Sequence, residues 1–255
     1  MWKPALIVLL ALILLSSNVN AQEGVDRDYF PVEMLNRTFF IKSGDVKGTG
    51  FSVDYQGKMY IITARHVVAG VPTRDAIIQI WQQEHWQDYH TVKTILPSSD
   101  DVDIAIFETN EKVEQPYRVT VNGTENTGLA QQVWFFGYPF ELETHFKSGK
   151  IAPFVKRGMV SAIDFTKPDA VVLYVDGCNN PGFSGGPIVF WDLSKRAYEI
   201  LGVVHGYRPD TTKAVVNGQR VDTNVLVNSG ILVGYSIEHA MKAIEDSRKQ
   251  ATVTK

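Results

Sequence analysis

Three residue types that together perform nucleophilic catalysis occur in this sequence, and the most distinctive of them is a serine. Ser184 lies in the segment Gly182-Phe-Ser-Gly-Gly-Pro187, just before a hydrophobic stretch. A serine hydroxyl is a weak nucleophile until a neighbouring base accepts its proton. The glycines permit a sharp turn in which the backbone amides of Gly182 and Ser184 converge, and converging amides stabilise an oxyanion. The same composition is also typical of an ordinary tight turn, so the segment alone leaves both interpretations open.

A histidine is the expected base, because its pKa lies near neutrality, and His66 is the best placed. It follows the apolar run Met59–Ile62, so its side chain can reach a cleft at the end of a strand. A purely structural histidine is the alternative at this position. The other histidines in the chain are His85, His90, His145, His205 and His239. Of these, His239 is predicted to lie on the polar face of a C-terminal helix.

A carboxylate stands at the head of another apolar run. Asp103 directly precedes Ile104-Ala-Ile-Phe107, whereas Asp100 and Asp101 are interpreted as solvated loop residues. An unpaired carboxylate is costly to bury, so we expect Asp103 to have a partner such as an imidazole N–H. That partnership would fix the tautomer and the orientation of the imidazole ring.

The composition is that of a folded globular protein. The chain has 255 residues, of which 44% are hydrophobic and 21% charged. Its single cysteine cannot form a disulfide within the chain, so the fold must depend on a packed core. The formal net charge of −3 argues against a broad surface for nucleic acid or acidic membrane.

Short runs rich in β-branched and aromatic residues recur along the chain, separated by turn residues, which is typical of an all-β fold. Gln56-Gly57 predicts a tight hairpin turn between two of them. A helical period appears only after Ser236, a plausible N-cap, where Ile237, Ala240 and Ile244 share one face. No linker or internal repeat divides the chain. The pattern therefore predicts many short antiparallel strands, arranged as a barrel or a pair of barrels and followed by one C-terminal helix.

The first residues predict a cleavable export signal over 1–21. A positively charged start, an apolar run Ala5–Leu15 and the small residues before Gln22 form the expected pattern. The apolar run is too short to span a bilayer, which needs about 20 residues in a helix. An uncleaved anchoring helix is the alternative.

Taken together and in order, four segments resemble the trypsin-like (chymotrypsin-fold) serine peptidases. They are Gly48-Thr-Gly-Phe51, Thr63-Ala-Arg-His66, Asp103-Ile-Ala105 and Gly182-Phe-Ser-Gly-Gly-Pro187. The resemblance is closest to compact bacterial-type members that lack a peptide-binding C-terminal domain. It implies two six-stranded antiparallel β-barrels with a C-terminal α-helix over residues 22–255, with the boundary between the halves near 115–130. It also implies that His66 is the general base, Asp103 its orienting partner and Ser184 the nucleophile, with the amides of Gly182 and Ser184 as the oxyanion hole.

Three departures from the family pattern concern activation and specificity. Phe183 stands where digestive members carry the aspartate that receives a newly cut N-terminus, so that activation switch is not expected. Cys178 falls near the position of the acidic residue at the base of a trypsin-type specificity pocket. A cysteine there does not supply the negative charge that would bind Lys or Arg, so cleavage after these residues is not supported. His205 is predicted to line the pocket, where it either reads an acidic substrate side chain or is a plain wall residue.

The resemblance implies a peptide or protein substrate and an acyl-enzyme mechanism, with no cofactor, no metal and no nucleic acid. The export signal over 1–21 predicts an exported protein, periplasmic or secreted, without stable membrane insertion after signal cleavage. The oligomeric state is left open. A catalytically inactive module that binds peptides through the same cleft is the alternative function, and an esterase on the same fold is a second one.

Overall fold

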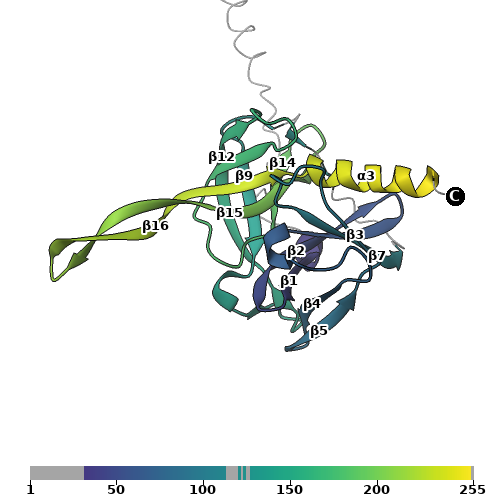
Figure 1. Ribbon diagram of the computed structural model, residues 1–255, viewed down its shortest axis with the longest axis horizontal. Helices are drawn as coiled ribbons and strands as arrows, with labels where there is room; N and C mark the ends of the chain where they lie inside the picture. Colours follow the sequence, from purple (N-terminus) through teal and green to yellow (C-terminus); the bar gives the residue numbers. More distant parts are fainter. Residues whose placement is uncertain (1–31, 113–119, 122, 125–126, 254–255) are drawn as a thin grey trace, which may run out of the picture. The chain divides into compact units, whose positions relative to one another are not determined.

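The computed structural model describes residues 32–112, 120–121, 123–124 and 127–253, and strands predominate among them. The segment 1–21, predicted to be an export signal, lies outside these residues. The strands form two large sheets and a small pair, β10 (Thr144–His145) and β11 (Ile151–Ala152) (Figure 1). The predicted all-β fold with two barrel-like halves and a C-terminal helix is confirmed. Among the helices described, none is long and apolar enough to cross a membrane.

The first sheet carries seven strands in the order β5-β4-β1-β2-β3-β7-β6. The predicted turn at Gln56-Gly57 joins β2 to β3, and both residues have positive φ, 47° and 78°. Positive φ at both central positions is what a two-residue hairpin requires if it is to follow the twist of its strands. The strands are β1 (Thr38–Ser43), β2 (Val46–Tyr55), β3 (Lys58–Thr63), β4 (Ile77–Gln82), β5 (His85–His90), β6 (Lys93–Ile95) and β7 (Ala105–Lys112).

The ends of β3 and β7 hold the two residues expected to do chemistry in this half. β3 pairs antiparallel with β7, and Thr63 lies opposite Ala105. A short 3-10 helix, η1 (Arg65–Val68), follows β3 and buries Val67 and Val68 in the core. Because those two valines fix η1, the neighbouring His66 is held at the edge of the sheet, next to Asp103, which lies two residues before β7.

The second sheet closes on itself. Its order is β14-β9-β12-β13-β16-β15-β8, and β14 also pairs with β15, which completes a ring of six strands. The seventh, β8 (Thr120–Val121), adds a short parallel edge to β15, so each half has one strand more than the six expected. Closure satisfies the backbone groups that an open edge would expose. The ring is built from β9 (Gln132–Gly137), β12 (Phe154–Asp164), β13 (Val172–Asp176), β14 (Pro187–Asp192), β15 (Ala197–Val216) and β16 (Gln219–Ser236).

Strands β15 and β16 continue far beyond the ring as a two-stranded ribbon, which we call the arm (Figure 1). Their pairing runs from Tyr207 opposite Leu232 out to Val216 opposite Gln219. The turn at the tip is Asn217-Gly218, again with positive φ at both residues, 51° and 78°. Among the described residues no third strand pairs with this stretch, and most of its side chains are exposed. The sequence predicted β15 only around 200–205 and missed the arm.

The predicted C-terminal helix is α3 (Glu238–Val253). Ser236 caps it as expected, because its hydroxyl accepts a hydrogen bond from the Glu238 amide at 3.3 Å. The placement of His239 on a polar face was wrong: the side chain is buried, and its Nε2 accepts a hydrogen bond from the Val171 amide at 2.8 Å. Burial lowers the pKa of His239.

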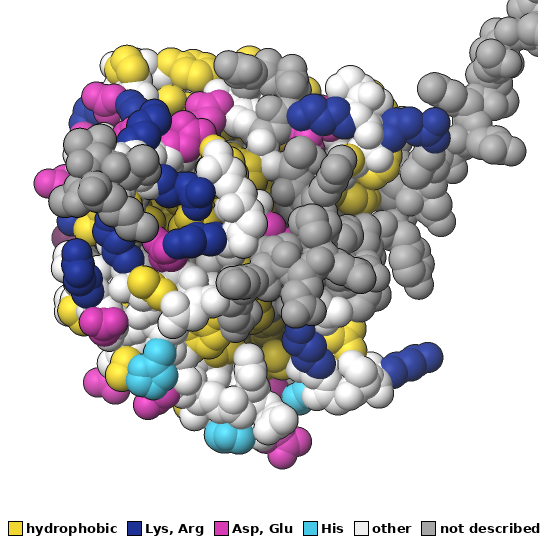
Figure 2. All heavy atoms as spheres, turned by 90° about the vertical axis from the view of Figure 1, so that its right-hand side faces the viewer, with side chains coloured by type: hydrophobic (Ala, Val, Ile, Leu, Met, Phe, Trp, Pro, Cys, Tyr) yellow, Lys and Arg dark blue, Asp and Glu magenta, His cyan; other side chains and the backbone are white. Residues whose placement is uncertain are grey.

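On the face that Figure 2 presents, Lys and Arg side chains are interspersed with Asp and Glu.

Candidate active site

The segment before Ser184 forms a tight turn whose geometry follows from its sequence. The Phe183 amide donates to the Asn180 carbonyl at 3.2 Å, which closes a four-residue turn. Proline occupies its second position, and Gly182 occupies the third with φ of +101°. A type II turn favours proline at the second position and requires positive φ at the third. A Cβ on Gly182 would also lie 2.1 Å from the Tyr138 carbonyl oxygen, so only glycine fits here.

Hydrogen bonds from neighbouring segments hold the peptide planes of this turn. The Phe140 amide donates to the Pro181 carbonyl at 3.0 Å, and the Gly186 amide donates to the Phe183 carbonyl at 2.9 Å. In a trans peptide the N–H points away from the C=O of the same unit. The N–H groups of Gly182 and Ser184 are therefore directed away from these two donors.

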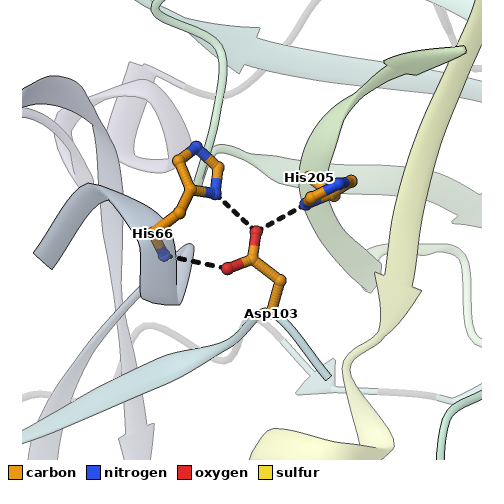
Figure 3. A group of neighbouring side chains, drawn as sticks. All are labelled: His66, Asp103 and His205. Carbon is orange, nitrogen blue, oxygen red and sulfur yellow. Dashed lines mark hydrogen bonds and ion pairs between the residues drawn. The ribbon is translucent and has the colours of Figure 1, made fainter. Parts of the chain in front are cut away.

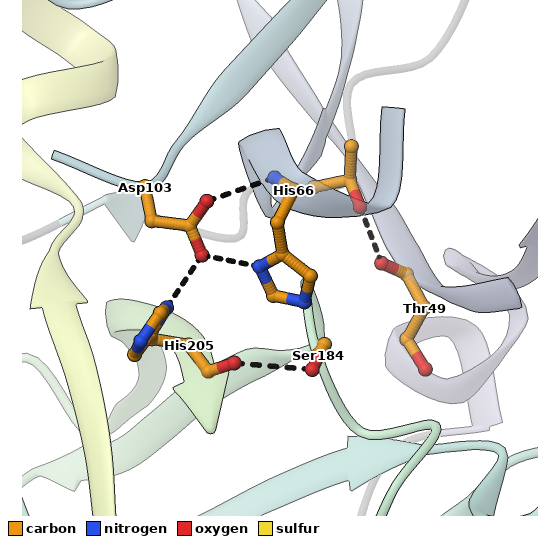
Figure 4. Close-up of polar contacts among 6 residues, drawn as sticks. Thr49, His66, Asp103, Ser184 and His205 are labelled. Carbon is orange, nitrogen blue, oxygen red and sulfur yellow. Dashed lines mark hydrogen bonds and ion pairs between the residues drawn. The ribbon is translucent and has the colours of Figure 1, made fainter. Parts of the chain in front are cut away.

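A threonine of the first half joins the turn to β2. The Thr49 hydroxyl donates to the Gly182 carbonyl at 2.6 Å, and the Thr49 amide donates to the Ser184 carbonyl at 2.8 Å. Figure 4 places Thr49 on the side of Ser184 opposite to His205. Thr49 belongs to the segment Gly48-Thr-Gly-Phe51, and its role was not predicted from the sequence. Its two bonds tie the serine to the other half of the molecule.

Phe183 anchors the serine from inside the second half. Its side chain is fully buried and its ring lies 5.3 Å from that of Phe135, centroid to centroid. The Lys156 ammonium lies 5.1 Å from the centre of the Phe183 ring. Because Phe183 points into the core, the next side chain along the chain, Ser184, faces outward.

Replacing Phe183 with alanine is expected to lower the free energy of unfolding by about 3–5 kcal/mol, since the change removes a buried aromatic ring and leaves a cavity. Urea unfolding of both proteins measures this loss. The matched control is Phe165→Ala, because the Phe165 side chain is exposed and should cost much less. An equal loss in the two variants would contradict the anchoring role of Phe183.

His66 and Asp103 are in direct contact, as the sequence predicted (Figure 3). The His66 Nδ1 lies 2.6 Å from Asp103 Oδ2, and the His66 backbone amide donates to Asp103 Oδ1 at 2.8 Å. The carboxylate thus fixes both the ring and the main chain of this histidine. In Figure 4 the outer ring nitrogen, Nε2, is turned toward Ser184.

A second histidine binds the same carboxylate oxygen, which the sequence analysis did not foresee. The His205 Nδ1 also lies 2.6 Å from Asp103 Oδ2 (Figure 3). The main-chain carbonyl of His205 accepts a hydrogen bond from the Ser184 hydroxyl at 3.0 Å. The pairing of β15 with β16 shifts register between Val204 and Gly206, which marks a bulge at His205. Bulges redirect side chains, and this one accompanies a ring aimed at Asp103.

These contacts determine the charge of Asp103 and the tautomers of the two histidines. Burial by itself raises the pKa of Asp103, but the hydrogen bonds from His205 and His66 outweigh it and hold that pKa well below its usual range. The carboxyl is therefore ionised near neutrality and can only accept hydrogen bonds. Each Nδ1 must then carry a proton, so in the neutral rings each Nε2 is free of one. His66 Nε2 is thus in the form that can accept a proton from a serine.

An open cavity of about 530 Å³ lies beside this group. His66 and Asp103 line it together with the apolar side chains of Val68, Val71 and Leu96. Solvent and ligands therefore have access to the histidine and to the carboxylate from this side.

The remaining predicted site residue, Cys178, is exposed and lies six residues before Ser184. Its carbonyl accepts a hydrogen bond from the Lys156 ammonium at 2.8 Å, and that ammonium also donates to Asn180 Oδ1. Lys156 was missed in the sequence analysis. In the structure exposed and half-buried residues alternate over the first part of β12, and Lys156 is one of the half-buried ones. Roles for Cys178 and His205 in reading the substrate stay predictions.

Known proteins resemble this chain over most of its described part. Protease Do-like 1 from the chloroplast of Arabidopsis thaliana is 26% identical over 165 residues, which is 65% of this chain and 34% of that protein. The chain thus spans about a third of the length of this relative. The active form of the Rv3671c protease from M. tuberculosis superposes with a TM-score of 0.51 at 18% identity, covering 84% of this chain and 82% of that one. The HtrA-type protease AlgW, solved with a tripeptide, gives a TM-score of 0.53 at 17% identity, covering 84% of this chain and 61% of that one.

The two solved structures are too distant in sequence to show more than a shared fold. The stronger finding is a match to the sequence model of a family, the trypsin-like peptidase domain, over residues 48–193. That range contains His66, Asp103 and Ser184 and covers more than half of the chain. This chain belongs to the trypsin-like peptidase domain family.

Proposed function

We propose that this protein is a serine endopeptidase in which Ser184, His66 and Asp103 form a catalytic triad. His66 Nε2 accepts the proton of the Ser184 hydroxyl as its oxygen attacks the carbonyl carbon of a peptide bond. The resulting imidazolium is stabilised by Asp103, which already holds the opposite ring nitrogen. His66 then gives the proton to the departing amine, and water hydrolyses the acyl-enzyme with His66 again acting as the base.

The oxyanion of each tetrahedral intermediate would be bound by the amides of Gly182 and Ser184. The bonds that orient the neighbouring carbonyls, from Phe140 and Gly186, support this assignment. Preorganised amide donors need no rearrangement when the charge develops, and this is the source of their effect on rate.

The single observation that carries the proposal is the pair of hydrogen bonds that His66 makes with Asp103, from its backbone amide to Oδ1 and from its ring to Oδ2. It orients the imidazole so that its basic nitrogen is turned toward Ser184. In the structure the Ser184 hydroxyl donates to the His205 carbonyl. A rotation about the Cα–Cβ bond brings such a hydroxyl to a base, and hydrogen bonds of this kind are often loose before substrate binds.

A fluorophosphonate probe tests the proposal, since it reacts only with an activated serine. We expect stoichiometric labelling of the wild-type protein and none of Ser184→Ala. The control variant is Ser161→Ala, whose serine lies on the exposed face of β12. An unlabelled wild-type protein with an intact fold would instead favour a peptide-binding module without activity. Labelling without cleavage of any peptide in a denatured protein mixture would favour an esterase.

The same peptide mixture reports the side chain that precedes the cut. We propose no cleavage preference for Lys or Arg, because no acidic side chain stands at Cys178. Enrichment of Glu or Asp would support His205 as a reader of the substrate. The composition of residues 1–21 supports export to the periplasm or the medium, which N-terminal sequencing of the exported protein would test.

A further inference from the structure

Two histidine side chains, those of His66 and His205, are hydrogen-bonded to the carboxylate of Asp103. His66 Nδ1, His205 Nδ1 and Asp103 Oδ2 all lie within 4.8 Å of one another. They come from η1, from β15 and from the segment just before β7, so three separate parts of the chain converge on one point (Figure 3). Hydrolysis requires only one of the two histidines as a base. The second therefore calls for an explanation of its own.

Two imidazole nitrogens and one carboxylate oxygen form a ligand set that suits a divalent transition metal, above all zinc. Tetrahedral zinc with bonds of roughly 2.1 Å keeps its ligand atoms roughly 3.4 Å apart. The nitrogen–oxygen distances of 2.6 Å would therefore have to open by under 1 Å. Both rings can move this far, because the side chains of His66 and His205 are 45% and 43% exposed.

The surroundings also favour a cation. The other oxygen of Asp103, Oδ1, stays bound to the His66 backbone amide, which would orient the carboxylate toward a metal. The nearest arginine along the chain, Arg65, is paired with Asp100 at 2.9 Å. The cavity that His66 and Asp103 line provides an entry path and room for water as a fourth ligand.

We propose that His66, His205 and Asp103 form an inhibitory binding site for zinc or a similar divalent transition metal, which switches the peptidase off. The inhibition rests on the proposed function, whereas metal binding does not.

The proton balance explains why a bound metal stops the reaction. In the resting protein each Nδ1 carries a proton that is donated to Asp103. Coordination by Nδ1 requires that nitrogen to be deprotonated, so in each neutral ring the proton moves through solvent to Nε2 and no net proton is released. His66 Nε2 then carries a proton and cannot accept the one from Ser184. The metal thus removes the base without contact with the nucleophile.

The test combines a direct and a functional measurement on the exported form of the chain. Calorimetric titration of metal-free protein with zinc chloride should give one equivalent of tight binding, and cobalt(II) should give the intense visible absorption of a tetrahedral site. Peptide cleavage, expressed relative to each protein's own metal-free rate, should fall with the same midpoint and return on addition of EDTA.

Loss of a ligand should weaken binding at least tenfold. We expect this of His205→Ser and also of His205→Gln, which offers a second chance of a well-folded variant. The matched control is His145→Ala, since His145 is an exposed histidine on β10. Cys178→Ser is the second control, because the exposed thiol is an alternative zinc ligand.

The outcomes separate the two proposals. Binding of one equivalent that depends on His205, in a protein that cleaves nothing, would support the metal site and overturn the proposed function. Cleavage that zinc does not affect, with no binding in the calorimeter, would overturn the metal site alone. Zinc affinity that falls in Cys178→Ser or His145→Ala, but not in the His205 variants, would overturn it as well.

Discussion

Replacement of His66 by alanine is expected to lower kcat for peptide cleavage by ~10⁶-fold while changing KM much less. Without this imidazole the other histidine at the site is His205, whose ring nitrogen Nδ1 is bound to Asp103. The Ser184 hydroxyl meets the main-chain carbonyl of His205 and not its ring, so we do not expect His205 to replace His66 as the base. Steady-state cleavage of one peptide by the wild type and the variant measures the effect. Sensitive detection is essential, because substrate binding and the oxyanion hole alone are expected to leave a rate only about 10³–10⁴-fold above that in water.

The double variant with Ser184→Ala provides the sharpest check. Groups that act as one unit lose nearly everything in the first substitution, so the double variant should be no slower than either single one. His85→Ala, which changes an exposed histidine on β5, should leave kcat within a factor of two. A double variant slower by the product of the two single effects would show that His66 and Ser184 act independently.

Asp103→Asn is expected to lower kcat by about 10⁴-fold, although the side chain keeps its shape. The His66 backbone amide can only donate, so it selects the oxygen of the new amide group. The NH₂ group then faces both imidazoles and donates to them. His66 must respond by taking the tautomer with its proton on Nε2, and in this form it cannot accept the proton of Ser184. Steady-state kinetics measure the loss, and the ¹⁵N chemical shifts of the His66 ring report the tautomer.

Asp101→Asn is the matched control, because Asp101 is exposed and, within the described part of the chain, forms its ion pair with Lys167 at 2.6 Å. Its activity should stay close to that of the wild type.

Urea unfolding as a function of pH checks the charge of Asp103 separately. Since the folded-state pKa is lowered, ionised Asp103 stabilises the fold above its ordinary pKa near 4, and the contribution is lost as the pH falls below that value. The stability difference between wild type and Asp103→Asn should therefore shrink on acidification below about pH 4, and a constant difference would contradict the lowered pKa.

Local patterns in the sequence were enough to predict several of the strands and the helix cap at Ser236, and the family resemblance supplied the pairing of His66 with Asp103. Those features depend on residues that are near one another in the chain or on a carboxylate that needs a partner.

What the sequence did not reveal depends on register and on three-dimensional proximity. The partnership of His205 with Asp103 accompanies a bulge in β15, and a single extra residue in a strand leaves no periodic signal. The same holds for Lys156, which reaches the turn at Asn180 from a neighbouring strand. The burial of His239 was missed because the helical period alone does not show that the Val171 amide needs an acceptor.

The arm and the closed ring of the second half should differ in the free energy that is needed to open their hydrogen bonds. A two-stranded ribbon with little buried apolar surface is marginal by itself, so its hydrogen bonds open locally at a small free-energy cost. The closed ring opens only when the whole half unfolds. Amide hydrogens from Arg208 to Asn228 should therefore exchange with solvent long before those of the ring. The bulge at His205 lies where the arm joins the ring, so local opening of the arm should leave the geometry around Asp103 intact.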